Sequence, residues 1–233
     1  MKAANQPSTL DDGLKRYNWL KIARIAWSGI ARRQRCVLCG ARARDCALCD
    51  GCVADLPWRE RPWRLRLAGI DEVTVGFDFD YPVRQLLHRA KYGPDIAVAR
   101  LLGQLFARQL ERSGDHLIRP AALFPVPMAR HRLLVRGYNQ ALEIALPISE
   151  QLAVPISEVS VYKRRGLRPQ SKLDAATRRT NVSNAFFLKQ APDVYTAVII
   201  DDVVTTGATV QALARALRRV GVARVQVWAL AAA

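Results

Sequence analysis

Two adjacent carboxylates and a hydroxyl-rich loop form the most chemically informative stretch of this chain. An apolar, β-branched run from Ala197 to Ile200 predicts a buried strand, and Asp201 and Asp202 follow it directly. A short loop then opens an apolar-periodic helix, and it contains Thr205, Thr206, Gly207, Ala208 and Thr209. Backbone N–H groups converge at such a glycine-centred loop, and the helix dipole adds partial positive charge there.

This order of groups predicts a cradle for a phosphate monoester. The carboxylates beside it suit the hydroxyls of a sugar or a divalent cation. The alternative is an ordinary strand–loop–helix unit with two solvated aspartates. We favour the phosphate site because strand, acidic pair, loop and helix occur together in one order.

All five cysteines lie between positions 36 and 52, which in a reducing compartment indicates a metal site rather than disulfides. Cys36 and Cys39 form one Cys-x2-Cys pair, and Cys49 and Cys52 form another. Two such pairs predict a tetrahedral, structural Zn²⁺ site, because four thiolates leave no open coordination position. A Cys46/Cys49 pairing is an alternative, and so is a set of reduced, buried cysteines without metal.

The chain is strongly basic, with 36 Lys and Arg against 20 Asp and Glu and a formal net charge of +16. This charge predicts polyanionic partners. Nine arginines occur between positions 31 and 66, with Trp58 and Trp63 among them. Such a mixture suits single-stranded nucleic acid through phosphate contacts and base stacking. The alternative is a solvated basic face with the tryptophans packed inward.

The N-terminal segment carries an apolar face that recurs from Trp19 to Ile30. This pattern predicts a helix docked on its own domain, with a membrane-surface helix as the alternative. No apolar run approaches the roughly 18 residues that cross a bilayer, and residues 1–12 lack a signal-peptide pattern. We therefore expect a cytoplasmic chain without a transmembrane segment.

Strands and helices are expected to alternate along the rest of the chain. This alternation predicts an α/β fold with a parallel sheet and a ligand site at the carboxyl ends of its strands. The expected strands cover residues 73–79, 121–126, 159–162, 185–188, 197–200 and 224–230, and the expected helices cover 82–92, 96–110, 140–152 and 210–221. Residues 128–136 are expected to form a basic loop and residues 163–172 a mobile one.

Residues 197–209 resemble the signature of type I phosphoribosyltransferases, which bind 5-phosphoribosyl-1-diphosphate (PRPP). The resemblance implies that Asp201 and Asp202 hold the ribose 2′- and 3′-hydroxyls and that residues 205–209 hold the 5′-phosphate. The implied PRPP-binding segment is continuous and comprises Asp201, Asp202, Val203, Val204, Thr205, Thr206, Gly207, Ala208 and Thr209.

Six sequence blocks in one order are similar to the ComF family (ComFC/GntX type), which is linked to natural competence and the use of DNA. The blocks lie at residues 36–58, 87–93, 125–127, 136–141, 178–182 and 197–209. The similarity implies a parallel-sheet type I phosphoribosyltransferase fold for residues 67–233, a small zinc-binding module at 31–66 and an extension at 1–30. Cys46 and the N-terminal 30 residues depart from the family's pattern.

The resemblance also implies roles for basic residues. Arg130, Arg132 and Arg136 fall where the diphosphate-binding loop is expected, and with Mg²⁺ they would stabilise the leaving diphosphate. Arg168 falls in the expected flexible loop and is a catalytic candidate beside Asp201 and Asp202, because closure of that loop would exclude water. Without the resemblance, solvated arginines on a basic protein are the simpler interpretation.

The implied function is that of a PRPP-binding phosphoribosyltransferase-family protein that acts in DNA uptake or utilisation and handles single-stranded DNA. Its acceptor is open, either a nucleobase or a nucleic-acid end. Two alternatives differ on turnover: a nucleic-acid-binding protein regulated by PRPP, and a structural partner of a DNA-translocating helicase. Both remain open because a fold can keep its ligand site and lose its reaction.

Overall fold

The computed structural model describes residues 35–43, 48–59, 67–92, 96–113, 121–163 and 185–233. The chain divides into two compact units, Met1–Cys49 and Asp50–Ala233. In the described part of the first unit, an antiparallel bridge joins Arg35 to Arg42. The backbone N–H of Cys36 donates to the carbonyl of Ala41 at 2.7 Å, so a tight turn carries the first cysteine pair.

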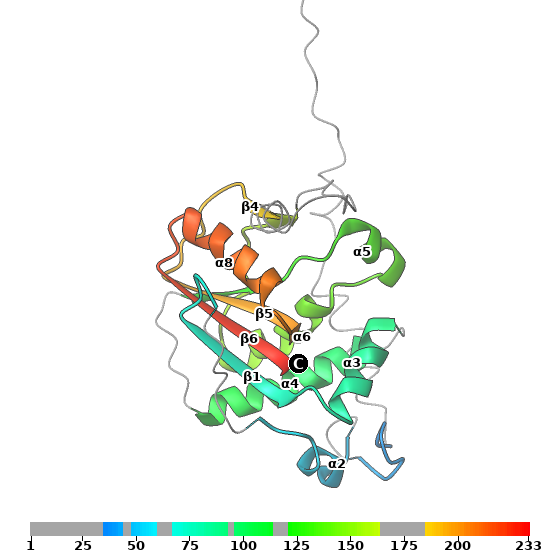
Figure 1. Cartoon of the computed structure of the whole chain (residues 1–233). Helices are drawn as coiled ribbons and strands as arrows, with labels where there is room; N and C mark the ends of the chain where they lie inside the picture. The colour runs from blue at the N-terminus through cyan, green and yellow to red at the C-terminus, as the bar shows by residue number, and fades with distance from the viewer. Residues whose placement is uncertain (1–34, 44–47, 60–66, 93–95, 114–120, 164–184) are drawn as a thin grey trace, which may run out of the picture. The chain divides into compact units, whose positions relative to one another are not determined.

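The second unit is built on a parallel sheet of four strands in the order β1-β6-β5-β2, of which Figure 1 labels β1, β6 and β5. The strands are β1 (Glu72–Asp78), β2 (Ala121–Pro125), β5 (Thr196–Val204) and β6 (Arg224–Ala232), and every pairing between them is parallel. The long β5 and β6 occupy the centre of the sheet, where both faces are covered. The predicted parallel α/β fold is therefore confirmed.

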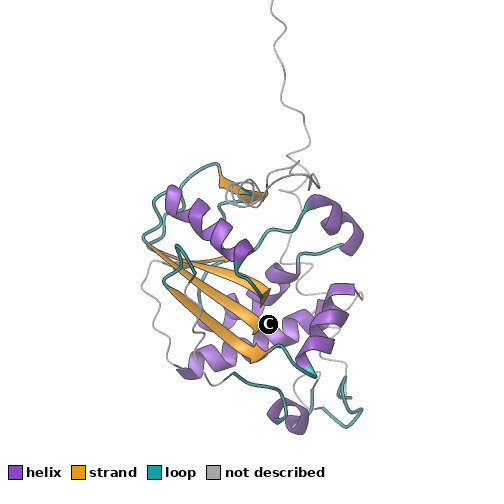
Figure 2. Cartoon of the chain, viewed as in Figure 1, coloured by secondary structure: helices purple, strands orange, loops and turns teal. Residues whose placement is uncertain are grey.

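Helices cover both faces of this sheet (Figure 2). On one face, α8 (Ala208–Arg219) packs on Ala197 and Ile199 through a core that also includes Leu213. The intervening residues of β5 point to the opposite face, because side chains alternate along a strand. That face is covered by α4 (Ile96–Ser113) and α6 (Gln140–Leu152), and α3 (Val83–Tyr92) packs on α4. The apolar runs thus become strands buried on both sides.

Two features fix the contact between α4 and α6. A Cβ on Gly103 would lie 2.5 Å from the carbonyl oxygen of Ile144 and 2.9 Å from Pro147 Cγ, so only glycine permits this close approach. Beside it, Arg100 Nε lies 2.6 Å from Glu143 Oε2, and both side chains are buried. The two helices are therefore held by backbone proximity and by an ion pair withdrawn from water.

Short segments lie along both outer strands of the sheet. Residues 57–59 run antiparallel to β1: Trp58 bridges Phe77, and Arg59 N donates to Gly76 O at 2.9 Å. The Trp58 indole packs on Phe77 with ring centroids 4.6 Å apart and the ring planes tilted by 39°. Its Nε1 donates to Val53 O at 2.9 Å, which ties the segment to α2 (Asp50–Ala54). Along β2, Leu123 N donates to Pro155 O at 2.8 Å.

A separate antiparallel pair is formed by β3 (Val161–Lys163) and β4 (Phe186–Leu188). Tyr162 and Phe187 stack with centroids 5.3 Å apart, and Lys189 Nζ lies 5.0 Å from the Tyr162 ring. Arg219, at the end of α8, donates to Phe186 O at 3.3 Å. This contact anchors the pair to α8.

Two expected boundaries were wrong. The expected basic loop at 128–136 contains a helix, α5 (Arg130–Arg136), which ends at Gly137 in the left-handed region with φ of 81°. The strand expected to end at Ile200 continues through Asp201 and Asp202 to Val204, because β6 goes on pairing with it as far as Ala232.

The expected helix around residues 19–30 and the expected loop at 163–172 lie outside the described residues, apart from Lys163 at the end of β3. None of the helices in the described ranges combines the length and the apolar character needed to cross a bilayer.

Candidate functional site

The acidic pair lies in the last part of β5, near the carboxyl ends of the parallel strands. Asp201 is in register with Ala229 of β6, so its neighbour on that strand has a small side chain. Asp201 Oδ1 accepts from Asp202 N at 2.9 Å, and Asp202 Oδ1 accepts from Val203 N at 2.8 Å. Each of these two contacts uses one oxygen of its carboxylate.

The second oxygen of Asp202 meets a cation that the sequence interpretation missed. Lys91 Nζ, near the end of α3, lies 2.9 Å from Asp202 Oδ2. Burial, followed by the charge of Asp202, raises the pKa of Asp201 from 3.8 to about 8, and Lys91 opposes this rise. The pair thus favours one shared proton or added positive charge over two free negative charges.

The predicted phosphate loop joins β5 to α8. Thr205, Thr206 and Thr209 are exposed, and the Thr206 hydroxyl accepts from Ala208 N at 3.4 Å. Gly207 begins α8 with φ of 72°, a conformation that L side chains rarely adopt. A Cβ there would also lie 2.6 Å from Leu67 Cδ2. Three threonines are therefore exposed at a helix start that requires glycine.

The loop after β2 begins beside the acidic pair. Val126 N donates to the carbonyl of Ile200 at 2.9 Å, immediately before Asp201 in the chain. Asn139 Nδ2 donates to Val126 O at 3.1 Å, while its Oδ1 accepts from Ala141 N at 3.2 Å and caps α6. One asparagine thus joins the start of α6 to the loop that the resemblance assigned to diphosphate.

The three arginines of that loop lie on one helix, α5. Arg132 is exposed, and Arg136 Nη1 lies 3.5 Å from Gln140 Oε1. Two of the three residues between them, Leu134 and Val135, are 81% and 90% exposed. Arg130 opens the helix. The outward face of α5 therefore combines positive charge with two unburied aliphatic side chains.

The segment after α5 holds these elements together. Gly137 N donates to Leu133 O at 2.7 Å and closes α5. The buried Tyr138 hydroxyl donates to the carbonyl of Ala90, one residue before Lys91. The block 136–141 thus positions α3, α5 and α6 around the edge that carries the acidic pair.

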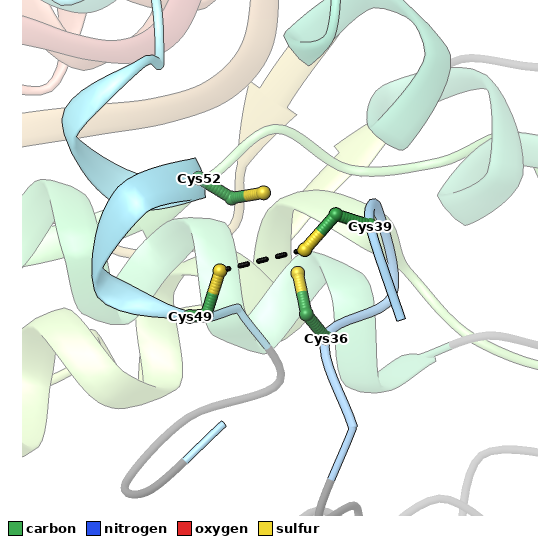
Figure 3. Close-up of side chains that lie close together, drawn as sticks. All are labelled: Cys36, Cys39, Cys49 and Cys52. Carbon is green, nitrogen blue, oxygen red and sulfur yellow. Dashed lines mark hydrogen bonds between the residues drawn. The ribbon is translucent and has the colours of Figure 1, made fainter. Parts of the chain in front are cut away.

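The four predicted metal ligands lie together (Figure 3). The sulfur atoms of Cys36, Cys39, Cys49 and Cys52 are within 4.8 Å of one another, and Cys39 and Cys49 are 3.5 Å apart. Bonds of about 2.3 Å from Zn²⁺ to four sulfurs give a tetrahedron with edges of about 3.8 Å. The cluster therefore fits a tetrahedral metal such as zinc.

Ionisation also favours metal binding at this cluster. Burial opposes ionisation of the Cys36 thiol, but hydrogen bonds from the backbone of Cys39, Cys49 and Leu38 lower its pKa from 9.0 to about 6. A thiolate is the form that binds metal. At neutral pH, Cys36 therefore favours the thiolate form that binds metal.

The described members of the Arg/Trp-rich stretch are used in two ways. Trp58 packs on Phe77, and Arg59 forms an ion pair with Asp78. This arrangement fits the inward-packed alternative for Trp58. Arg42 is exposed. Cys46, Arg44, Trp63 and the catalytic candidate Arg168 lie outside the described residues.

Comparisons with known proteins agree with this arrangement. The family model described as "Phosphoribosyl transferase domain" matches residues 139–233. The DNA utilization protein YhgH of Escherichia coli (strain K12) is 34% identical over 198 residues, covering 84% of this chain and 82% of the relative. Competence protein F of Haemophilus influenzae is 29% identical over 220 residues, covering 88% and 93%.

Among solved structures, a hypoxanthine phosphoribosyltransferase from Staphylococcus aureus matches 63% of this chain and 71% of its own, with a TM-score of 0.36 and 11% identity. At this score the likeness supports no conclusion of its own.

Proposed function

Because this chain belongs to the ComF family, we propose that it binds PRPP and transfers its phosphoribosyl group during DNA uptake or utilisation. The observation that carries the proposal is the acidic pair near the end of β5, followed by the exposed threonines and the glycine that open α8. We propose that the protein works in the cytoplasm, where reducing conditions keep thiolates available for metal.

In this proposal the ribose 2′- and 3′-hydroxyls donate to Asp201 and Asp202. The 5′-phosphate accepts from N–H and hydroxyl groups of residues 205–209, at the positive end of the α8 dipole. Arg130, Arg132 and Arg136 of α5 bind the diphosphate. The link from Ile200 through Val126 to Asn139 supports this assignment, because it brings the start of the diphosphate loop to the acidic pair.

The reaction forms a bond from an acceptor atom to C1′ as the bond from C1′ to the diphosphate oxygen breaks. Diphosphate leaves with the electron pair, and the acceptor's proton passes to solvent. Charge therefore develops on the leaving group, where the α5 arginines stabilise it most effectively. Fixing the ribose on two carboxylates orients C1′ toward the acceptor.

Mg²⁺ would supply further charge neutralisation on the diphosphate. The two carboxylates at this edge already have partners: Lys91 and Val203 N for Asp202, and Asp202 N for Asp201. Magnesium usually binds through one or two carboxylates plus substrate phosphates. The edge therefore fits Mg²⁺ that arrives with PRPP better than a resident ion.

The four cysteines would hold Zn²⁺ as a structural ion. Four thiolates leave no position for water or substrate, so the metal would stabilise the fold around residues 36–52 rather than take part in the reaction.

Single-stranded DNA is the proposed macromolecular partner. The net charge of +16 and the exposed Arg42 support it. Because Trp58 and Arg59 make internal contacts, we assign the base-stacking role in this proposal to Trp63.

A second candidate function has one observation in its favour. Leu134 and Val135 are exposed on the helix that carries the proposed diphosphate ligands. A protein partner such as a helicase that docks there would sense bound PRPP without any turnover. Under this candidate, PRPP is a regulator rather than a substrate.

Calorimetry with PRPP and Mg²⁺ tests the binding proposal. Replacing Asp201 and Asp202 together with alanine should cost about 2–4 kcal/mol in affinity, because two hydroxyls lose their carboxyl acceptors. Asp193→Ala is the matched control, since this aspartate is exposed and precedes β5 at its other end. Equal binding by wild type and the double variant would refute the assignment.

Isotope-labelled PRPP then separates the two candidates. It is incubated with nucleobases and with single-stranded DNA, and diphosphate release is scored with the ribosylated product. A product supports the transferase, and binding without product for any acceptor supports the regulated partner.

Fluorescence anisotropy at several salt concentrations tests DNA binding. Single strands should bind more tightly than duplex, and affinity should fall steeply with salt. Arg42→Glu should weaken binding more than Arg112→Glu, an equal charge change at the exposed end of α4. Equal effects of the two changes, or equal affinity for both forms of DNA, would leave only a generic basic protein.

A further inference from the structure

The ion pair between Lys91 and Asp202 joins two blocks that are far apart in the sequence. Lys91 Nζ lies 2.9 Å from Asp202 Oδ2, and the side chains are 32% and 16% exposed. Among the ion pairs of the described residues, this one reaches the acidic pair. Lys91 is therefore part of the proposed ribose site, although no spacing in the sequence relates it to that site.

The position of Lys91 is fixed by its surroundings. Its neighbour Ala90 accepts a hydrogen bond from the buried Tyr138 hydroxyl, so the end of α3 is tied to the segment between α5 and α6. Asp202 is held from the other side, because its Oδ1 accepts from Val203 N. The ammonium group thus meets the carboxylate in an arrangement set by both backbones.

A cation at this edge reduces the electrostatic repulsion between the two adjacent carboxylates. Two adjacent carboxylates disfavour each other's ionised form, and a hydroxyl donates its strongest hydrogen bond to a carboxylate that is ionised. One ammonium beside the pair offsets part of this repulsion. A lysine has three donors, and the contact with Asp202 uses one of them. In our proposal the remaining donors serve oxygens of a bound sugar phosphate.

We propose that Lys91 is the built-in cation of the ribose site, which lets the diol of a ribose phosphate bind to the acidic pair without a divalent ion. Mg²⁺ is then required only by the diphosphate of PRPP. The inference rests on the proposed PRPP binding, and it makes Lys91 a positioning residue for Asp202.

Ribose 5-phosphate is the probe, because it carries the diol and the 5′-phosphate but no diphosphate. Its affinity is measured by calorimetry in EDTA and again in Mg²⁺. Wild type should bind with the same affinity, within about threefold, in both conditions. The affinity of Lys91→Met for ribose 5-phosphate should be about tenfold or more below that of wild type in EDTA, and Mg²⁺ should restore part of this affinity. Lys91→Arg should retain the wild-type pattern, and Lys189→Met is the matched control.

Each outcome decides the inference. It is overturned if wild type needs Mg²⁺ to bind ribose 5-phosphate, or if Lys91→Met binds as well as wild type in EDTA. If Lys91→Met melts early, the Lys91→Arg and wild-type measurements still decide. If the Asp201/Asp202 double variant loses affinity for PRPP while Lys91→Met binds ribose 5-phosphate like wild type, the PRPP proposal stands and only the proposed role of Lys91 is wrong. If wild type binds neither compound, both proposals fail.

Discussion

Gly207→Ala should destabilise the protein through two separate effects. The residue has φ of 72°, where a non-glycine residue costs about 1–2 kcal/mol. Its new Cβ would lie 2.6 Å and 2.8 Å from the two methyl carbons of Leu67, a buried residue that packs in the core beneath α8. Overpacking of this kind costs about 1–3 kcal/mol. The sum is about 2–5 kcal/mol, measured by urea unfolding.

A matched control separates the two effects. Gly221, just beyond the other end of α8, also has positive φ, at 95°, but a Cβ there meets nothing within 4 Å. Gly221→Ala should therefore cost only the backbone strain. Because Gly207 lies in the proposed phosphate loop, its variant should also lose PRPP affinity, whereas Gly221→Ala should not. Equal destabilisation by both variants would show that Leu67 moves aside, and the packing argument would then be wrong.

Three further predictions concern the buried ion pair, the acidic pair and the cysteines. Arg100→Met should cost about 3–5 kcal/mol in urea unfolding because it leaves the Glu143 carboxylate buried alone, and adding Glu143→Leu should restore most of that loss; a double variant as unstable as the single one would contradict this. The pKa of Asp201 rises from 3.8 to about 8 on folding, so the stabilisation it gives is complete below about pH 4 and lost as pH rises through 8. Asp201→Asn should remove this loss of stability at high pH. The same pH dependence of urea unfolding in wild type and Asp201→Asn would contradict the prediction. Metal analysis should find about one zinc per chain, lost in Cys52→Ser and retained in Cys46→Ser; the reverse result would make the ligand set wrong.

Much of the fold could be predicted from local patterns. The apolar runs around Ala122, Val198 and Val227 are long enough and sufficiently β-branched or apolar to indicate buried strands, and their alternation with helical periods indicates a parallel sheet. The Cys-x2-Cys spacing likewise predicted the cluster of four sulfur atoms, because each pair lies on one short turn or helix start.

The errors have physical causes. Asp201 and Asp202 looked like the end of a strand because they are charged, but β6 still offered them backbone partners. Residues 130–136 looked like a loop because the apolar Leu134 and Val135 lie on the exposed face of α5, so the segment lacks the usual amphipathic pattern.

Two roles depend on tertiary contacts that no local pattern reveals. Lys91 meets Asp202 only because α3 ends beside the carboxyl end of β5. Asn139 is recognisable as a helix cap from its type and position. Its second bond, to Val126 O, depends on where the loop after β2 lies.

Residues 57–59, which run along β1, link the proposed zinc site to the edge of the sheet. The Trp58 indole N–H holds this segment by donating to the carbonyl of Val53. Val53 directly follows Cys52, a proposed zinc ligand. Chelation that unravels α2 would remove the acceptor of the indole N–H and loosen residues 57–59 from the sheet. The freed N–H and C=O groups of β1 would then be a template for strand pairing with another molecule. Loss of zinc would thus appear first as self-association, before the core around β5 and β6 unfolds.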